Sequence, residues 1–246
     1  MERTVLITGA TRGLGLAMAE AFAKAGFRVA INYAHSDANA RTALDRVEAF
    51  GTAALFKADV LTEAGVDCLM REVTDRFGPP DTLVLNATPA QEQKPVEDYT
   101  PEDVSSMSAA FMMSPYYLTK AALPTMKKSG FGRIIHITSE VFQEGTPQFS
   151  AYVAAKGAQV GYMRSTAKEL AADGITVNAV APGWIPVERH TDVPKETLNQ
   201  YLATVPAGRW GTPADIAHAA LFFADEKSGF LTGQTLAVNG LSLIHI

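Results

Sequence analysis

A glycine-rich turn near the start of the chain restricts its fold more than any other feature. The apolar run Thr4–Ile7 precedes the turn, and the run Leu16–Phe22, rich in alanine and large apolar residues, follows it. Apolar and β-branched residues, then glycines, then a helix-forming run predict a strand, a tight turn and a helix. The glycines Gly9, Gly13 and Gly15 are spaced Gly-x-x-x-Gly-x-Gly. Such a turn lets the backbone approach a pyrophosphate at the positive end of the helix.

The rest of the chain repeats the alternation of strand and helix. Strand-like runs occur at Val5–Thr8, Val29–Asn32, Ala53–Lys57, Leu83–Asn86, Arg133–Thr138, Thr176–Val180 and Thr235–Val238. Amphipathic helical runs lie between most of them, at Asn39–Phe50, Gly65–Phe77, Ala151–Ala172 and Ala214–Ala224. This order predicts an α/β fold, a doubly wound parallel sheet with helices on both faces and a ligand at the carboxyl ends of the strands. We expect residues 1–240 to form one Rossmann-type domain.

Composition excludes several classes of protein. The 246 residues carry a net charge of −5, which gives no reason to expect a nucleic-acid partner. One cysteine, Cys68, leaves no internal disulfide and no cysteine metal cluster, and we expect no metal site. No apolar run is long enough to span a membrane, and the first strand begins within a few residues of the N-terminus. We therefore expect a cytoplasmic protein with no membrane association.

Three polar residues late in the chain form a candidate catalytic group. Tyr152 and Lys156 are four residues apart, about one helical turn, and Ser139 lies upstream of both. A tyrosine hydroxyl has an ordinary pKa of about 10, and a neighbouring ammonium lowers it toward the range useful for proton transfer. A serine hydroxyl can donate a hydrogen bond to a carbonyl oxygen that gains negative charge.

These residues, with the glycine turn, make the sequence similar to the classical branch of the short-chain dehydrogenase/reductase family, and above all to its 3-oxoacyl-[acyl-carrier-protein] reductase-like members. The similarity runs from Thr4 to about Gly240. The other motifs that carry it are Asp59-Val60, Asn86-Ala87, Ile137-Thr138-Ser139, Asn178-Ala179-Val180-Ala181-Pro182-Gly183, Arg209 to Ala217, and Leu231-Thr232-Gly233-Gln234.

The resemblance implies a role for each catalytic residue. Ser139 would polarise the substrate carbonyl, Tyr152 would pass a proton to its oxygen, and Lys156 would lower the pKa of Tyr152 and bind the nicotinamide ribose. The family also uses an asparagine, which links the lysine to solvent as a proton relay, but Phe111 stands at that position here. Either water reaches Lys156 by another route, past Ser108 or Ser114, or proton resupply is slow.

The resemblance also implies a nicotinamide cofactor site. Its expected residues are Gly9, Thr11, Arg12, Gly13, Leu14, Gly15, Asn32, Ser36, Asp59, Val60, Asn86, Ala87, Tyr152, Lys156, Pro182, Gly183 and Ile185. The second strand does not end in the acidic residue that would bind a ribose 2′-hydroxyl. Arg12 and Ser36 could instead bind a 2′-phosphate, so NADP(H) is favoured over NAD(H). Asp59 could also be a simple turn or helix cap.

Residues 182–209 form a long proline-containing excursion, which corresponds to the family's substrate loop and contains Trp184 and His190. Residues 241–246 depart from the usual family ending, and we assign them no function. Glu140 could face the pocket or cap the next segment, and His136 is expected to be buried and satisfied.

The leading hypothesis is an NADPH-dependent reductase of a ketone or β-keto thioester, assembled as a homotetramer. The alternatives are a sugar, polyol or alcohol dehydrogenase that uses the same residues, and a catalytically weak NADP-binding sensor or scaffold.

Overall fold

A seven-stranded parallel sheet forms the centre of the protein. The computed structural model describes residues 2–188, 191 and 193–243. The strand order is β3-β2-β1-β4-β5-β6-β7, and all neighbouring strands are parallel. The strands are β1 (Thr4–Ile7), β2 (Arg28–Tyr33), β3 (Ala53–Lys57), β4 (Thr82–Leu85), β5 (Gly132–Ile137), β6 (Ile175–Pro182) and β7 (Thr235–Val238). Each strand expected from the sequence is confirmed.

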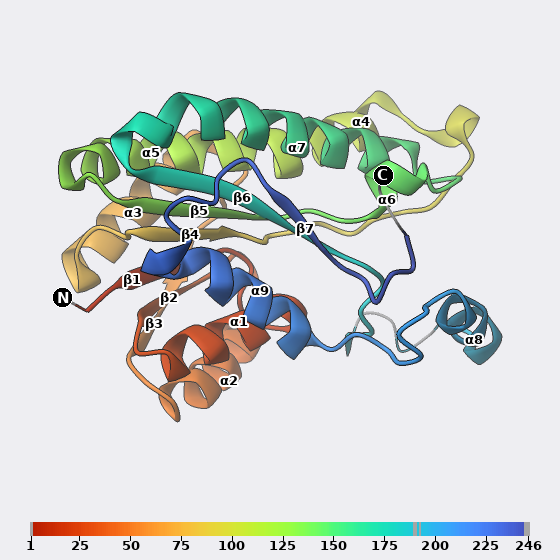
Figure 1. Ribbon diagram of the computed structural model, residues 1–246, viewed down its shortest axis with the longest axis horizontal. Helices are drawn as coiled ribbons and strands as arrows, with labels where there is room; N and C mark the ends of the chain where they lie inside the picture. The colour runs from red at the N-terminus through yellow and green to blue at the C-terminus, as the bar shows by residue number, and fades with distance from the viewer. Residues whose placement is uncertain (1, 189–190, 192, 244–246) are drawn as a thin grey trace.

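Helices cover both faces of the sheet (Figure 1). One face carries α1 (Gly13–Lys24), α2 (Asp37–Glu48) and α9 (Pro213–Ala224), and the other carries α3 (Glu63–Phe77), α5 (Ser114–Ser129) and α7 (Ser150–Leu170). Three shorter helices, α4 (Pro101–Ser108), α6 (Val141–Glu144) and α8 (Lys195–Ala203), lie toward the carboxyl ends of the strands. A π-helical turn, Ala109–Met113, joins α4 to α5. Short 3-10 turns occur at Val96–Asp98, Ala171–Asp173 and Glu226–Ser228.

The alternation of side chains along each strand builds two hydrophobic cores. In β1, Val5 and Ile7 pack into the core under α1 and α9, whereas Leu6 packs into the core under α3, α5 and α7. Successive residues of a strand point to opposite faces, so a strand that is covered on both faces is largely apolar. Every residue of β1, β4, β5 and β6 is accordingly buried.

The strand order changes direction between β1 and β4, which are neighbours in the sheet but are separated in sequence by β2 and β3. A doubly wound sheet binds its ligand at such a switch point, outside the carboxyl ends of the strands. The glycine turn follows β1 and Asn86 follows β4, so the fold brings both to this crevice.

Candidate active site

Helix α7 presents Tyr152 and Lys156 on one buried face, where their side chains are 8% and 3% exposed. The ammonium of Lys156 donates to the carbonyl of Ile137 at 2.8 Å, the last residue of β5. Ser139 follows two residues later, and its Oγ accepts from the backbone N–H of Val141 at 3.4 Å. This contact between α7 and β5 brings the lysine and tyrosine to the strand end that carries the serine, as the sequence predicts.

Phe111, which the resemblance assigns to the position of the family's asparagine, lies beside Lys156. It lies in the π-helical turn, is 2% exposed, and its ring centroid is 3.9 Å from Nζ of Lys156. The same ring packs edge-to-face on Tyr152 with centroids 5.3 Å apart. An aromatic face attracts an ammonium but accepts no ordinary hydrogen bond from it and holds no water. The relay position is therefore filled by an apolar group.

A route for water to Lys156 past Ser108 or Ser114, in place of the asparagine relay, stays a prediction. Ser108 donates its hydroxyl to the carbonyl of Val104 in its own helix at 3.0 Å, and Ser114 is buried.

A glutamine that the sequence analysis did not single out also contacts the lysine. Nζ of Lys156 donates to Oε1 of Gln159 at 3.0 Å, and Nε2 of Gln159 lies 3.4 Å from Nδ1 of His136. His136 is fully buried, and this burial, with the charge of Lys156, lowers its pKa from 6.5 to about 3. Its Nε2 has no hydrogen-bond partner among the described residues, so His136 is buried as expected but only half satisfied. The signal for Gln159 was its spacing, because residues 152, 156 and 159 fall on one helix face.

Close backbone approaches explain the glycines of the turn after β1. Gly9 has a φ of 62°, and a Cβ added there would lie 3.0 Å from Cα of Ala87. A Cβ on Gly15 would lie 2.7 Å from the amide nitrogen of Asn86. Larger residues would therefore displace the end of β4 and fill the space at the start of α1. This cradle fits a pyrophosphate held by backbone N–H groups at a helix N-terminus.

Asn86 and Thr8 fasten the turn to β4. The amide of Asn86 donates to the carbonyls of Thr8 at 2.9 Å and Gly9 at 3.2 Å. The hydroxyl of Thr8 accepts from the backbone N–H groups of Asn86 and Ala87, each at 2.9 Å. Thr8, which the site prediction did not include, thus holds the two sides of the switch point together.

The part of the site that is predicted to bind the adenosine contains an exposed arginine and an ion-paired carboxylate. Arg12 is exposed just before α1, and Ser36 is exposed at the N-cap of α2. The nearby carboxylate of Asp37 accepts from Lys57 at 2.9 Å and from Tyr33 at 3.0 Å, and the Lys57 contact is the main cause of its lowered pKa. Because Lys57 balances Asp37, this acid repels a phosphate less than a lone carboxylate would.

Other predicted cofactor residues have structural duties as well. Asn32 donates to the carbonyls of Phe56 and Ala58, and Asp59 accepts from the N–H of Leu61 at 2.9 Å, whereas Val60 is buried. Their contacts with a cofactor stay predictions, as do those of Thr11 and Leu14.

The chain leaves the sheet at Pro182 and passes close to the glycine turn. Gly183 donates its N–H to Val238, and Ile185 is buried. Residues 186–188 line one side of a cavity of about 330 Å³ whose other side includes Gly13 and Leu16. Residues 186–188 therefore lie against the start of α1, beside the glycine turn. His190 lies outside the described residues.

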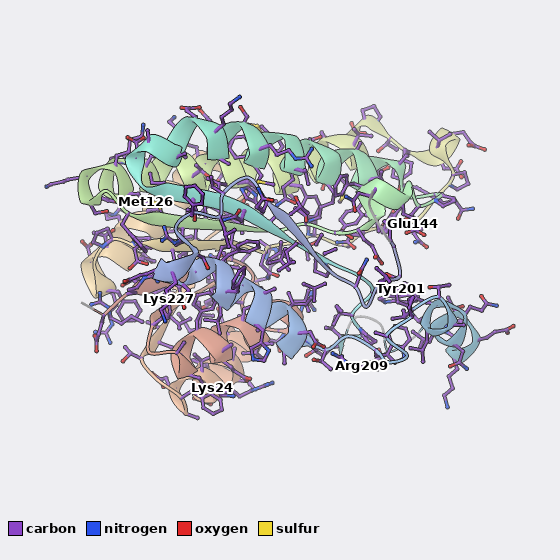
Figure 2. The ribbon with its side chains drawn as sticks, in the orientation of Figure 1. Lys24, Met126, Glu144, Tyr201, Arg209 and Lys227 are labelled. Atoms are coloured by element: carbon purple, nitrogen blue, oxygen red, sulfur yellow. The ribbon has the colours of Figure 1, made fainter. Side chains whose placement is uncertain are left out.

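Glu140, directly after Ser139, links its own segment to α8 and to the segment that follows β7. Its buried carboxylate accepts from Tyr201 of α8 at 3.0 Å, from Asn239 at 2.9 Å and from Ser242 at 2.7 Å. Tyr201 also accepts from the N–H of Trp184 at 2.7 Å. In Figure 2 Tyr201 lies at the carboxyl end of the sheet, between α8 and the strands. Glu140 is thus neither a simple cap nor free in the pocket, and Ser242 has a structural contact although we assigned the tail no role.

Two kinds of feature are missing from the part of the chain that the structure describes. Among the described residues, no group of three or more His, Cys, Asp or Glu side chains is placed to hold a metal ion. None of the helices in this part of the chain combines the length and the apolar character needed to cross a membrane.

Comparison with known proteins agrees with this geometry. A family model described as Enoyl-(Acyl carrier protein) reductase matches residues 9–240. The 3-oxoacyl-[acyl-carrier-protein] reductase FabG of Staphylococcus aureus strain Mu50 is 35% identical over 243 residues, 98% of each chain. An acetoacetyl-CoA reductase of Rhizobium meliloti strain 1021 is 36% identical over 242 residues, again 98% of each chain. A crystal structure of a 3-oxoacyl (acyl-carrier-protein) reductase from Agrobacterium tumefaciens C58 with NADP bound superposes with a TM-score of 0.89 and 32% identity, covering 97% of this chain and 93% of that one.

Proposed function

Because the chain belongs to the short-chain dehydrogenase/reductase family, we propose that it is an NADPH-dependent reductase of a β-keto thioester or related ketone. The observation that carries the proposal is the buried Tyr152–Lys156 pair, whose lysine donates to the Ile137 carbonyl at the strand end that leads to Ser139. Relatives named as 3-oxoacyl-[acyl-carrier-protein] and acetoacetyl-CoA reductases support the substrate class, and the neighbour with NADP bound supports the cofactor.

When bound, NADPH supplies the hydride that reaches the carbonyl carbon. Ser139 then donates a hydrogen bond to the carbonyl oxygen, where negative charge develops. Tyr152 gives its proton to that oxygen, which leaves a phenolate next to the Lys156 ammonium. The phenolate must take up a proton before the next turnover. The glycine turn, Asn86 and Thr8 would hold the cofactor, with Arg12 and Ser36 at its 2′-phosphate.

The decisive experiment follows loss of NADPH absorbance with a substrate panel. We expect acetoacetyl-CoA and β-keto esters to be reduced, and Tyr152→Phe to abolish reduction while NADPH still binds. Tyr116→Phe, a change of the same kind at an exposed position of α5, should keep full activity.

The panel also separates the alternatives. Faster reduction of crotonyl-CoA would indicate a C=C reductase, in keeping with the description of the family model. Oxidation of sugars or polyols with NADP⁺ alone would indicate the dehydrogenase alternative. Tight NADPH binding without turnover of any substrate would indicate a sensor or scaffold.

The assembly we propose is a homotetramer. Classical family members pair through the helices that flank the fifth strand and through the last strand. Here those regions expose large apolar side chains, with Met113 just before α5, and Phe222, Phe230 and Leu236 at α9 and around β7. Phe230 is fully exposed in the monomer. A second copy of the chain would bury these residues, and closed D₂ symmetry would use both surfaces. Light scattering that finds a stable monomer at micromolar concentration would contradict this proposal.

Two further expectations belong to the proposal. We expect residues 182–209 to act as the substrate loop of a single domain spanning residues 1–240, because residues 186–188 lie beside the glycine turn and α8 lies at the same end of the sheet. The cytoplasmic location expected from the sequence can be tested by cell fractionation.

A further inference from the structure

Three protein groups contact the Lys156 ammonium. The carbonyl of Ile137 lies at 2.8 Å, Oε1 of Gln159 at 3.0 Å and the Phe111 ring at 3.9 Å. A lysine ammonium has three N–H donors and no acceptor, on a flexible chain with much rotamer freedom. Two fixed oxygen acceptors and an aromatic face therefore determine where the charge lies.

The orientation of the Gln159 amide follows from the same contacts. Because the ammonium can only donate, the amide oxygen must face Lys156 and the amide nitrogen must face His136. Nδ1 of His136 then accepts, which places the ring proton on Nε2 and leaves the imidazole neutral. His136 sits in the middle of the sheet in β5, so the rigid backbone of a central strand supports the glutamine.

We propose that Gln159 is a positioning residue for the catalytic lysine, with His136 fixing its amide. This role rests on the proposed function, since Gln159 acts only through Lys156 and Tyr152. The amide oxygen of Gln159 accepts a hydrogen bond from Lys156, whereas the Phe111 ring on another side of the ammonium accepts none. The side chains of Lys156, Gln159 and His136 are all buried, so water competes weakly for the hydrogen bonds between them.

The role predicts an effect on the pH profile of reduction. Tyr152 must be protonated to give its proton, so the rate falls at high pH, with a midpoint set by how strongly the ammonium favours the phenolate. If Gln159 no longer holds the ammonium in place, the phenolate is favoured less. The midpoint must then move to higher pH.

The test compares Gln159→Met, which keeps the length of the side chain but removes the acceptor, with the parent enzyme. NADPH-dependent reduction of acetoacetyl-CoA is followed across the alkaline range. We expect the midpoint to rise by about one pH unit, a tenfold change in the proton equilibrium. Met163→Leu is the matched control, a buried apolar residue one turn further along α7, and its profile should coincide with the parent profile.

A double-variant cycle tests the role of His136. His136→Leu removes the Nδ1 acceptor and should shift the midpoint in the same direction, by a smaller amount. Added to Gln159→Met, it should produce no further shift, because it acts through the amide that is already gone. Additive shifts would refute the proposed order of contacts.

A second readout does not need turnover. Ultraviolet titration of tyrosinate in the NADP⁺ complex, with Tyr152→Phe as the reference, should show the same displacement in Gln159→Met. If Gln159→Met does not fold, Gln159→Glu serves instead. Its carboxylate would pair with the ammonium and compete with the phenolate, so the midpoint should again rise.

The outcomes separate the two proposals. A parent enzyme that reduces no substrate contradicts the proposed function. An active parent enzyme whose folded Gln159 variants keep the parental midpoint contradicts the role of Gln159 and leaves the proposed function standing.

Discussion

Burial of His136 should make the protein sensitive to mild acid. The imidazole has a pKa of about 3 in the folded protein, because it is fully buried and lies near Lys156, against 6.5 when it is unperturbed. Between these values the unfolded chain binds a proton that the folded chain does not. The contribution of this group to stability is therefore complete above pH 6.5 and is lost progressively as the pH falls toward 3.

The stability lost between pH 7 and pH 5 depends mainly on the pKa of His136 in the unfolded chain, since pH 5 still lies above its pKa in the folded protein. Lowering the pH from 7 to 5 should reduce the free energy of unfolding by about 2 kcal/mol per subunit, because the unfolded chain protonates His136 and the folded chain does not. The conversion is about 1.36 kcal/mol per pKa unit. Carboxylates also respond to acid, so the quantity to measure is the difference between two proteins.

The assay is urea unfolding of the parent and His136→Asn at pH 7 and pH 5, at one fixed protein concentration because assembly changes apparent stability. Asparagine does not titrate, so the parent should lose about 2 kcal/mol more than the variant. His218→Asn, at an exposed position of α9, is the control and should lose as much as the parent. Equal acid losses for the parent and His136→Asn would show that His136 is protonated in the folded protein, which would refute both the burial argument and the assigned tautomer.

Three other changes test separate parts of the site. Arg12→Ala should weaken NADPH binding by roughly tenfold to a hundredfold, the size of one charge-assisted contact, with little effect on NADH; tighter binding of NADH than of NADPH by the parent enzyme would overturn the cofactor assignment. Phe111→Asn, once its melting temperature is shown to be near that of the parent, should raise kcat, leave KM unchanged and reduce the solvent isotope effect; an unchanged or lower kcat would mean that proton resupply is not limiting. Tyr201→Phe should raise KM more than it lowers kcat, because it releases α8 from Glu140 without touching Tyr152, and equal kinetics for the two proteins would show that this contact does not hold the substrate loop.

The fold followed from the sequence because the strands lie in largely apolar runs that alternate with helical runs, and the glycine turn marked where β1 ends and α1 begins. The common buried face of Tyr152 and Lys156 also followed from the sequence, since the two residues are one helical turn apart, whereas their catalytic role stays a prediction. Counting from flanking motifs assigned Phe111 to the family's asparagine position, and the π-helical turn places its ring against Lys156.

Other contacts were not predictable, because they join segments that are far apart in the sequence. Gln159 meets His136 only once α7 packs on β5, and their positions are 23 residues apart. Asn32, which we assigned to the cofactor, directs its amide at the carbonyls of Phe56 and Ala58, a pairing that needs the register of β2 and β3. Local patterns carry no information about such partners.

The contacts of Glu140 also bear on the order in which the protein is made. Its carboxylate accepts from Asn239 and Ser242, which lie 99 and 102 residues later in the chain. These partners are added last during synthesis, whereas a single domain folds as a unit, and residues of α9 such as Ile216 and Phe223 belong to the core under α1. The residue beside Ser139 acquires its full set of partners only after the ribosome has added residues 239–242. A chain that ends before residue 239 therefore lacks two of the three side-chain donors to the Glu140 carboxylate.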